Sequence, residues 1–315
     1  MRKLIVTSLL ITTLMGCSKV NNTSKVFCFD TYVDIALSEG NKNNIKEIEN
    51  ILKKLDKLSD NYNQRDLINV FSLNKTNEEV SVDKDLYEMI KLAYKSKNEG
   101  AEYFNPLCGS LSKLWKESLI EKKIPSQEEI NSELNKMSSS SLTFKDEYII
   151  QRNGEAEIDL GGIAKGYALD KIQEYLKSED IKSYLINGGE SSILLGEKKS
   201  KDGCYTIGFR DVENAYIKVK NCFVSTSSKR TQKVVIDNVT YSHIINPKDG
   251  SAFNENDAVV VISDKGWYGD VMSTSLMMNT VDEIKQIEID HDIKTIVIKD
   301  GKIVYHHEGI EVLKH

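Results

Sequence analysis

The sequence predicts a globular protein built from both helices and β-strands, and three patterns indicate this. Residues 42–59 and 85–96 carry apolar side chains at helical spacing. Residues 26–36 have the composition of a sheet strand. In the second half strand and turn signals alternate, and we expect these runs to extend the sheet: 184–196, 205–208, 216–219, 222–226, 234–236 and 258–262. With 315 residues, 40% of them hydrophobic, the chain can bury a full core in one large domain or two.

The segment around which the chain is organised is residues 157–169, a Gly-rich turn between a strand-like hairpin and a helix. Glycines allow a ligand to approach the backbone closely, and a helix N-terminus offers unpaired N–H groups and a positive dipole. Lys165 adds a mobile cation, so the segment suits a phosphate group. Taken alone, it fits equally well an ordinary strand-to-helix turn in which Asp159 caps the helix and Lys165 is solvated.

A second polar pair occurs in residues 270–278, which have a helical pattern. Asp270 and Thr274 are four residues apart, so both side chains lie on one helical face. Two oxygen ligands one turn apart suit Mg²⁺, which completes its octahedron with waters and phosphate oxygens. The alternative is that Asp270 is the helix N-cap and Thr274 is a core residue bonded back to the helix. Both interpretations stay open at this point.

The N-terminus resembles a bacterial lipoprotein signal. Arg2 and Lys3 precede an apolar run at 4–14, which is too short for a permanent transmembrane helix. The run leads into Met15-Gly16-Cys17, so we expect residues 1–17 to be a lipoprotein signal that is cleaved before Cys17, which becomes the lipidated first residue. Residues 18–25 would then be a tether and 26–315 the folded domain, anchored to the outer face of the cytoplasmic membrane. A plain secretory peptide with an incidental cysteine is the alternative.

Composition and cysteine spacing exclude some classes of function. A pI near 5.6 and a net charge of −6, without a basic run, argue against a nucleic-acid binder. Four cysteines follow Cys17, and none forms a C-x-x-C pair, so we expect no zinc site. Cys204 and Cys222 lie in neighbouring strand-like runs and either pair or remain free thiols.

Two further turns have two interpretations each. The aromatic turn at 100–109 could stack a flat ring, although packing in the core explains it more often. Gly188 and Gly189 separate two strand-like runs, and they form either a tight hairpin turn or a second close approach to a ligand.

Four segments, in their order and spacing, resemble the ApbE family of FAD:protein FMN transferases: 158–168, 187–189, 242–250 and 270–274. The tripeptide at 29–31 is similar to the opening strand of that family, and 103–106 followed by Leu114-Trp115 is similar to its Gly-aromatic-Asp…Leu-Trp segment. The resemblance extends from about Phe29 to the C-terminus. Four ordered motifs are far more specific than any one of them.

The resemblance implies an α+β fold with mixed or antiparallel sheets flanked by helices, and with FAD in a cleft between subdomains. It implies Mg²⁺-dependent transfer of FMN from FAD to a Thr or Ser hydroxyl of an exported redox protein, with release of AMP. His243 is the candidate base, and Lys165 and Asp270 are further catalytic candidates. The metal would lie among Gly162, Asp270, Ser273 and Thr274. The FAD-binding residues would be Phe29, Tyr103, Phe104, Asn105, Asp159, Lys165, Gly188, Gly189, His243 and Ile245.

Three positions depart from the family pattern. Phe29 replaces the usual Met, Ser273 stands where many members have a second Asp, and residues 224–228 lack the Gly common after Thr-Ser. Two rival functions also stay open. With water as acceptor the same site would be an FAD pyrophosphatase that produces FMN and AMP, and without turnover it would be a flavin-binding lipoprotein.

Overall fold

The computed structural model describes residues 22–210, 212–230, 233–236, 239–252 and 255–314. The predicted signal segment and Cys17 lie outside these ranges. Within them no helix is long and apolar enough to cross a membrane. The described helices are α1 (Lys42–Ser59), α2 (Val70–Leu73), α3 (Lys84–Lys95), α4 (Gly109–Glu121), α5 (Gln127–Ser138), α6 (Ala164–Ser178), α7 (Gly266–Ser275) and α8 (Val281–Asp290), with 3₁₀ turns η1 (Ser96–Glu99) and η2 (Leu276–Met278).

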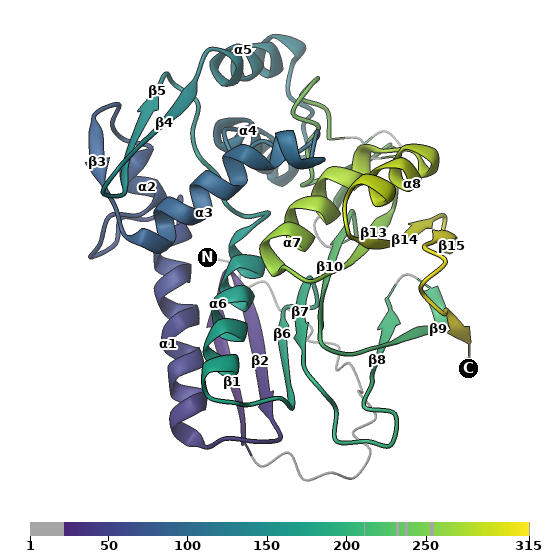
Figure 1. The fold of residues 1–315 in the computed structure, drawn as a ribbon. Coiled ribbons are helices and arrows are strands. Elements are labelled where there is room, and N and C mark those ends of the chain that lie inside the picture. Colours follow the sequence, from purple (N-terminus) through teal and green to yellow (C-terminus); the bar gives the residue numbers. More distant parts are fainter. Residues whose placement is uncertain (1–21, 211, 231–232, 237–238, 253–254, 315) are drawn as a thin grey trace.

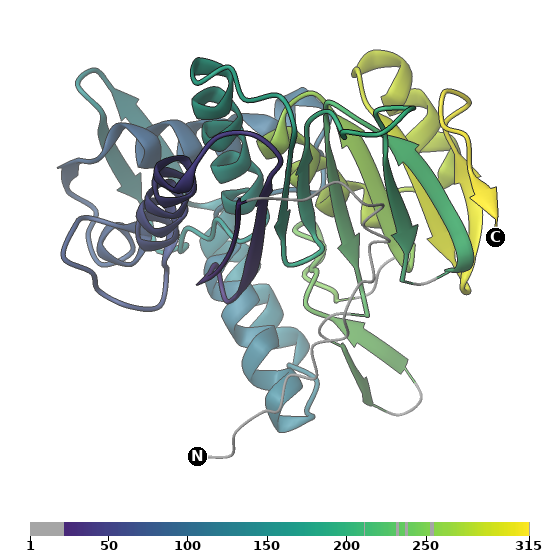
Figure 2. The same cartoon turned by 90° about the horizontal axis from the view of Figure 1, so that it is seen from below.

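The main sheet is antiparallel throughout and has the strand order β1-β2-β6-β7-β10-β13-β14-β15. Figure 2 shows these strands in a row, from the purple N-terminal pair to the yellow C-terminal pair. Their bounds are β1 (Asn22–Cys28), β2 (Thr31–Leu37), β6 (Tyr184–Gly188), β7 (Ser192–Leu195), β10 (Cys222–Ser228), β13 (Ala258–Ser263), β14 (Lys294–Lys299) and β15 (Lys302–His306).

Three smaller sheets hold the other strands that the structure describes. They are β16-β9-β8, β3-β5-β4 and β11-β12, built from β3 (Glu79–Ser81), β4 (Ser141–Lys145), β5 (Ile149–Asn153), β8 (Tyr205–Phe209), β9 (Val212–Val219), β11 (Lys233–Ile236), β12 (Val239–Ser242) and β16 (Leu313–Lys314). The expectation that 205–208, 216–219 and 234–236 extend one sheet is therefore wrong. Ile217 of β9 instead packs with Leu195 and Val224 of the main sheet, so the smaller sheet covers part of its outer face.

Helices cover the inner face of the main sheet. Figure 1 shows α1 and α6 side by side along β1, β2 and β6, with α7 above β10. Apolar residues recur along α1, for example Ile48 and Leu55, and these pack in one cluster with Ile172 of α6 and Ile35 of β2. Amphipathic helices on an antiparallel sheet are the α+β arrangement that the sequence predicts.

Two boundaries near the N-terminus differ from expectation. β1 begins at Asn22, so residues 22–25 belong to a strand rather than to the tether. Residues 26–36 are two strands of a hairpin rather than one strand. The turn consists of Phe29 and Asp30, both with positive φ (51° and 56°), which is the conformation of a two-residue type I′ turn.

Candidate active site

The Gly-rich turn before α6 is held by its own side chain and by the aromatic loop. Asp159 Oδ1 accepts the N–H of Gly161 at 2.7 Å, and the Asp159 N–H donates to Pro106 O at 2.8 Å. The helix starts at Ala164, after Ile163 as N-cap. Asp159 therefore caps the turn and not the helix.

The backbone N–H groups at this helix start are largely used inside the protein, contrary to the expectation that they are unpaired. Ile163 and Ala164 donate to Leu160 O at 3.0 and 2.9 Å. Gly166 donates to Asp270 Oδ2 at 2.7 Å. An anion at this turn would therefore depend on Lys165 and on other cations more than on free backbone donors.

α6 and α7 touch through their backbones at two glycines. A Cβ on Gly166 would lie 2.1 Å from the carbonyl oxygen of Gly266, and a Cβ on Gly266 would lie 2.4 Å from that of Gly166. No side chain fits between these atoms, so glycine at both positions allows the close approach. This contact brings Asp270 of α7 against the first turn of α6.

Asp270 accepts hydrogen bonds from three different elements. Ser192 Oγ of β7 and Ser225 Oγ of β10 each donate to its Oδ1 at 2.7 Å, and Gly166 occupies its Oδ2. Asp270 is buried, with only 6% of its surface exposed to solvent. Burial raises the pKa of the carboxyl, and the nearby Lys165 charge and the three donors oppose this rise. The N-cap interpretation of Asp270 is wrong, because α7 starts earlier, at Gly266, with Lys265 as its N-cap.

Hydroxyl groups gather next to Asp270. Ser273 Oγ and Thr274 Oγ1 donate to the Asp270 carbonyl oxygen at 3.0 and 3.1 Å, as the alternative interpretation of Thr274 expects. Ser227 Oγ lies 3.0 Å from Ser273 Oγ and 3.2 Å from Thr274 Oγ1. A Cβ on Gly162 would be 3.5 Å from Thr274 Oγ1, so the Gly-rich turn adjoins this cluster. The structure thus brings all four predicted metal residues together and adds Ser227.

The donor set suits a small hard cation. A carboxylate oxygen has two lone-pair positions, so Oδ1 of Asp270 is filled by two serines, whereas Oδ2 keeps one position free. Among the described residues no three His, Cys, Asp or Glu side chains form a metal-binding group. One carboxylate with hydroxyl oxygens, waters and ligand phosphates is a donor set that fits Mg²⁺ and does not fit a zinc site.

Lys165 extends from α6 towards the β6–β7 turn. Its Cδ lies 3.8 Å from where a Cβ of Gly188 would be, and its charge acts on Asp270 and on Cys28. In the part of the chain that the structure describes, no carboxylate lies within ion-pair distance of its ammonium group. Lys165 is therefore a half-buried cation that is available to an anionic ligand.

The two turns next to Lys165 are tightly shaped hairpin ends. Gly189 has φ +64°, and a Cβ there would lie 2.4 Å from Thr31 Oγ1 on the neighbouring hairpin. On that hairpin the N–H of Phe29 donates to Asp56 Oδ1 of α1 at 2.6 Å. Burial raises the pKa of Asp56. Asp56, which the sequence did not single out, thus fixes a turn whose half-buried aromatic ring is a predicted flavin contact.

The residues of the aromatic loop differ in their exposure to solvent. Phe104 is buried, and a Cβ on Gly162 would be 2.7 Å from its ring, so core packing explains this residue. Tyr103 is half-buried, and its N–H donates to Ser275 Oγ at 3.0 Å. Asn105 Oδ1 accepts the N–H of Leu107 and shapes the loop.

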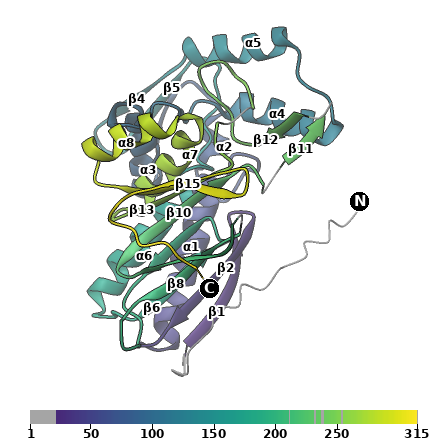
Figure 3. The same cartoon turned by 90° about the vertical axis from the view of Figure 1, so that its right-hand side faces the viewer.

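His243 and Ile245 lie on the segment after β12, which packs on α4 (Figure 3). His243 is exposed, and Ile245 packs in a small cluster with Trp115, whose Nε1 donates to Gly250 O at 2.7 Å. Lys248 joins this segment to the aromatic loop, because its Nζ lies 4.0 Å from the Tyr103 ring centroid.

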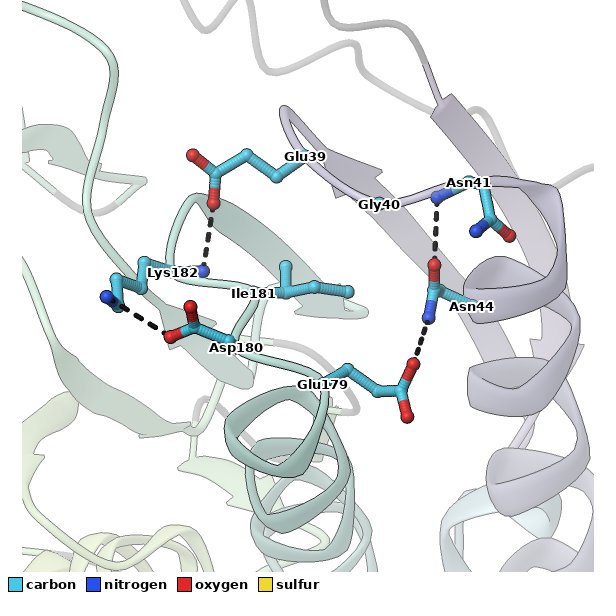
Figure 4. Close-up of a pocket in the computed structure, with 8 residues that line it drawn as sticks. All are labelled: Glu39, Gly40, Asn41, Asn44, Glu179, Asp180, Ile181 and Lys182. Carbon is cyan, nitrogen blue, oxygen red and sulfur yellow. Dashed lines mark hydrogen bonds and ion pairs between the residues drawn. The ribbon is translucent and has the colours of Figure 1, made fainter.

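The described cysteines and the surface depression drawn in Figure 4 lie outside this cluster. Cys28, Cys108, Cys204 and Cys222 are all free thiols, so the structure contains no Cys204–Cys222 disulfide. The depression in Figure 4 is lined by residues 39–41, 44 and 179–182. It lies at the C-terminal end of α6, about 20 Å along the helix from the Gly-rich turn. None of the predicted site residues lines it.

These features define an α+β protein of antiparallel sheets with a polar site assembled from α6, α7 and neighbouring strand ends. Residues 29–297 match the ApbE family. The chain belongs to this family, which confirms the resemblance and the fold class.

Relatives and solved structures agree with this assignment. The chain is 30% identical over 213 residues to an FAD:protein FMN transferase of Klebsiella pneumoniae, covering 62% of this chain and 63% of that protein, which is less than two thirds. It is 24% identical to the enzyme of that name from Chlamydia pneumoniae, covering 81% and 82%. The Thermotoga maritima ApbE structure superposes with a TM-score of 0.79 at 25% identity, covering 91% and 97%. Flavin transferase ApbE from Vibrio cholerae has the same fold, with a TM-score of 0.73 at 20% identity, covering 93% and 96%.

Proposed function

We propose that this protein is a Mg²⁺-dependent flavin transferase that moves FMN from FAD to a Thr or Ser hydroxyl of an exported redox protein. The names of its relatives support the flavin transfer. The observation that carries the proposal is the meeting of Lys165, which has no ion-pair partner among the described residues, with the oxygen cluster of Asp270 and Thr274 at one helix start. A ligand that needs both features is a diphosphate bound together with a metal ion.

In this proposal the chain binds FAD by its central diphosphate and by its aromatic rings. Lys165 contacts the diphosphate from α6, while Phe29 and Tyr103 border the flat rings. Asp270 Oδ2, Thr274 Oγ1 and the hydroxyls of Ser227 and Ser273 would hold Mg²⁺. The bound ion would offset the negative charge of the diphosphate and of the departing AMP.

The transfer is a displacement at the FMN phosphorus. The acceptor hydroxyl oxygen forms a bond to this phosphorus while the bond to the oxygen of AMP breaks, and the hydroxyl proton passes to a base. His243 is our candidate for this base. The products are AMP and a flavin joined to the acceptor by a phosphoester.

We also propose that the protein is anchored outside the cytoplasmic membrane by a lipid on Cys17. The signal pattern of residues 1–17 supports this. Cys17→Ser should leave the signal uncleaved or release active protein from the membrane fraction. Wild-type protein that is found unacylated and freely soluble would overturn the localisation.

An assay with protein, FAD, Mg²⁺ and exported redox proteins as acceptors tests the function. We expect protein-bound flavin fluorescence that survives denaturation, and one AMP released per flavin attached. AMP with free FMN and no bound flavin would show a pyrophosphatase instead. FAD binding without AMP would show a passive flavin-binding protein.

A further inference from the structure

A carboxylate of each of the helices α6 and α7 accepts backbone N–H groups from the first turn of the other helix. Asp270 of α7 accepts the N–H of Gly166 in the first turn of α6. In return, Asp170 of α6 accepts the N–H groups of Gly266 and Trp267, the first residues of α7, at 2.8 and 2.7 Å. Each helix therefore supplies the anion for the N-terminal turn of the other, across the contact of the two glycines.

Asp170 replaces a cap that α7 lacks in its own sequence. The N-cap residue of α7, Lys265, makes no side-chain capping hydrogen bond. The first N–H groups of a helix have no partner within the helix, and burial without partners is costly. Asp170 satisfies two of them from a neighbouring helix, so it determines where α7 begins relative to α6.

The position of this start affects the oxygen cluster directly. Asp270 lies about 6 Å along α7 from Gly266, roughly one turn away, and Thr274 is one turn further. Burial raises the pKa of Asp170 to about 7, and the charges of Asp270 and Glu174 add to this rise. A carboxyl group is thus kept where charge is disfavoured, on a contact that helps to fix the start of α7.

We propose that Asp170 is a positioning residue for the cation site: it fixes the start of α7 so that Asp270 and Thr274 face the Gly-rich turn at ligand-binding distance. The inference rests on the proposed function, because it assigns Asp170 to the metal of that site. Asp170 itself does not contact FAD or the ion.

Two variants and a control test the inference at pH 8, where the Asp170 carboxyl is ionised. Asp170→Asn keeps the volume but puts an amide N–H₂ against one of the two backbone donors, and Asp170→Ser shortens the side chain so that its hydroxyl no longer reaches them. Asp282→Asn is the matched control, because it makes the same change from carboxylate to amide on a side chain of α8 that is 92% exposed. Thermal unfolding of each variant is measured first, so that only folded protein is compared.

The main readout is Mg²⁺ binding to the protein–FAD complex, measured by titration calorimetry, with FAD affinity measured separately in EDTA. We expect Asp170→Asn and Asp170→Ser each to weaken Mg²⁺ binding about tenfold, while FAD affinity in EDTA and the Asp282→Asn protein stay unchanged. Equal losses of Mg²⁺ and FAD binding would indicate general damage and overturn the inference. So would wild-type Mg²⁺ binding in both folded variants.

Turnover distinguishes this inference from the function itself. If the wild-type protein binds Mg²⁺ and the variants bind it more weakly, the positioning role holds even where no FMN transfer is detected, and only the proposed reaction fails. If transfer is detected, the Mg²⁺ concentration for half-maximal rate should rise in parallel with the calorimetric values, with a smaller change in the rate at saturating Mg²⁺.

Discussion

Asp270 is the residue whose substitution separates structural from electrostatic roles, because its three hydrogen-bond donors differ in kind. Two are serine hydroxyls, which donate or accept, and the third is the Gly166 N–H, which only donates. In Asp270→Asn the amide oxygen can face Gly166 while its N–H₂ donates to the two hydroxyls. All three hydrogen bonds are then kept and the negative charge is lost.

Asp270→Ala instead leaves the buried Gly166 N–H without an acceptor and opens a cavity. An unsatisfied buried donor costs about 1–3 kcal/mol, and we expect a total loss of about 3 kcal/mol. For a protein of this size that lowers Tm by about 5 °C. Asp270→Asn should stay within about 1 kcal/mol of wild type.

Both variants should lose FMN transfer by about 10²-fold or more, since an electrostatic stabiliser of the transition state is worth about 3 kcal/mol of barrier. The assays are differential scanning fluorimetry in EDTA and AMP release at saturating FAD. Asp282→Asn is the control, because the Asp282 side chain on α8 is 92% exposed. A stable Asp270→Asn protein with near wild-type turnover in limiting Mg²⁺ would reject Asp270 as a ligand. An Asp270→Ala protein as stable as wild type would reject its structural role.

Three further predictions concern neighbouring groups. Lys165→Ala should weaken FAD binding much more than riboflavin binding, because riboflavin lacks the diphosphate. Lys177→Ala, at the other end of α6, is the control. Equal losses for both ligands would show that Lys165 does not bind the phosphates. Gly166→Ala should destabilise the fold by about 3 kcal/mol in urea unfolding, because its Cβ would lie 2.1 Å from a backbone oxygen. In the control variant Gly161→Ala the new Cβ would meet only Asp159 Oδ1, at 3.1 Å, and stability should be nearly unchanged. The pKa of Asp170 in the folded protein is raised to about 7, so between about pH 4 and 7 the folded state holds a proton that the unfolded state has lost. The free energy of unfolding should therefore fall as pH rises from about 4 to 7, and Asp170→Asn should make this fall less steep. Asp56 and Asp270 have raised pKa values too and leave a residual slope, so an unchanged slope in Asp170→Asn is the contradicting result.

The sequence predicts the elements whose pattern is local. α1 runs from Lys42 to Ser59, as the apolar spacing indicates, and the order of the motifs identifies the family. The start of α7 is not predictable in this way, because Gly266 and Gly269 are poor helix formers. Packing against α6 and the cap from Asp170 stabilise this turn, and both come from a distant part of the chain.

Some site residues cannot be predicted from the sequence for the same reason, because their partners lie far away in the chain. Ser192, Ser225 and Asp56 have no motif of their own, and each acts on a residue 27 to 78 positions away. Strand composition likewise does not tell which sheet a strand joins, so from sequence alone β8 and β9 are expected in the main sheet. The sequence predicts free backbone donors around the Gly-rich turn because nothing near Gly166 in the sequence reveals its partner Asp270.

The most direct test of the central claim is the fate of FAD labelled in both halves. With ³²P in the FMN phosphate and ¹⁴C in the adenine, the wild-type protein is incubated with Mg²⁺ and an exported redox protein, and the denatured acceptor is then counted. The account predicts ³²P on the acceptor, ¹⁴C recovered as AMP in equal amount, and loss of both signals in EDTA. An acceptor without ³²P, or labelling that persists undiminished in EDTA, would contradict it.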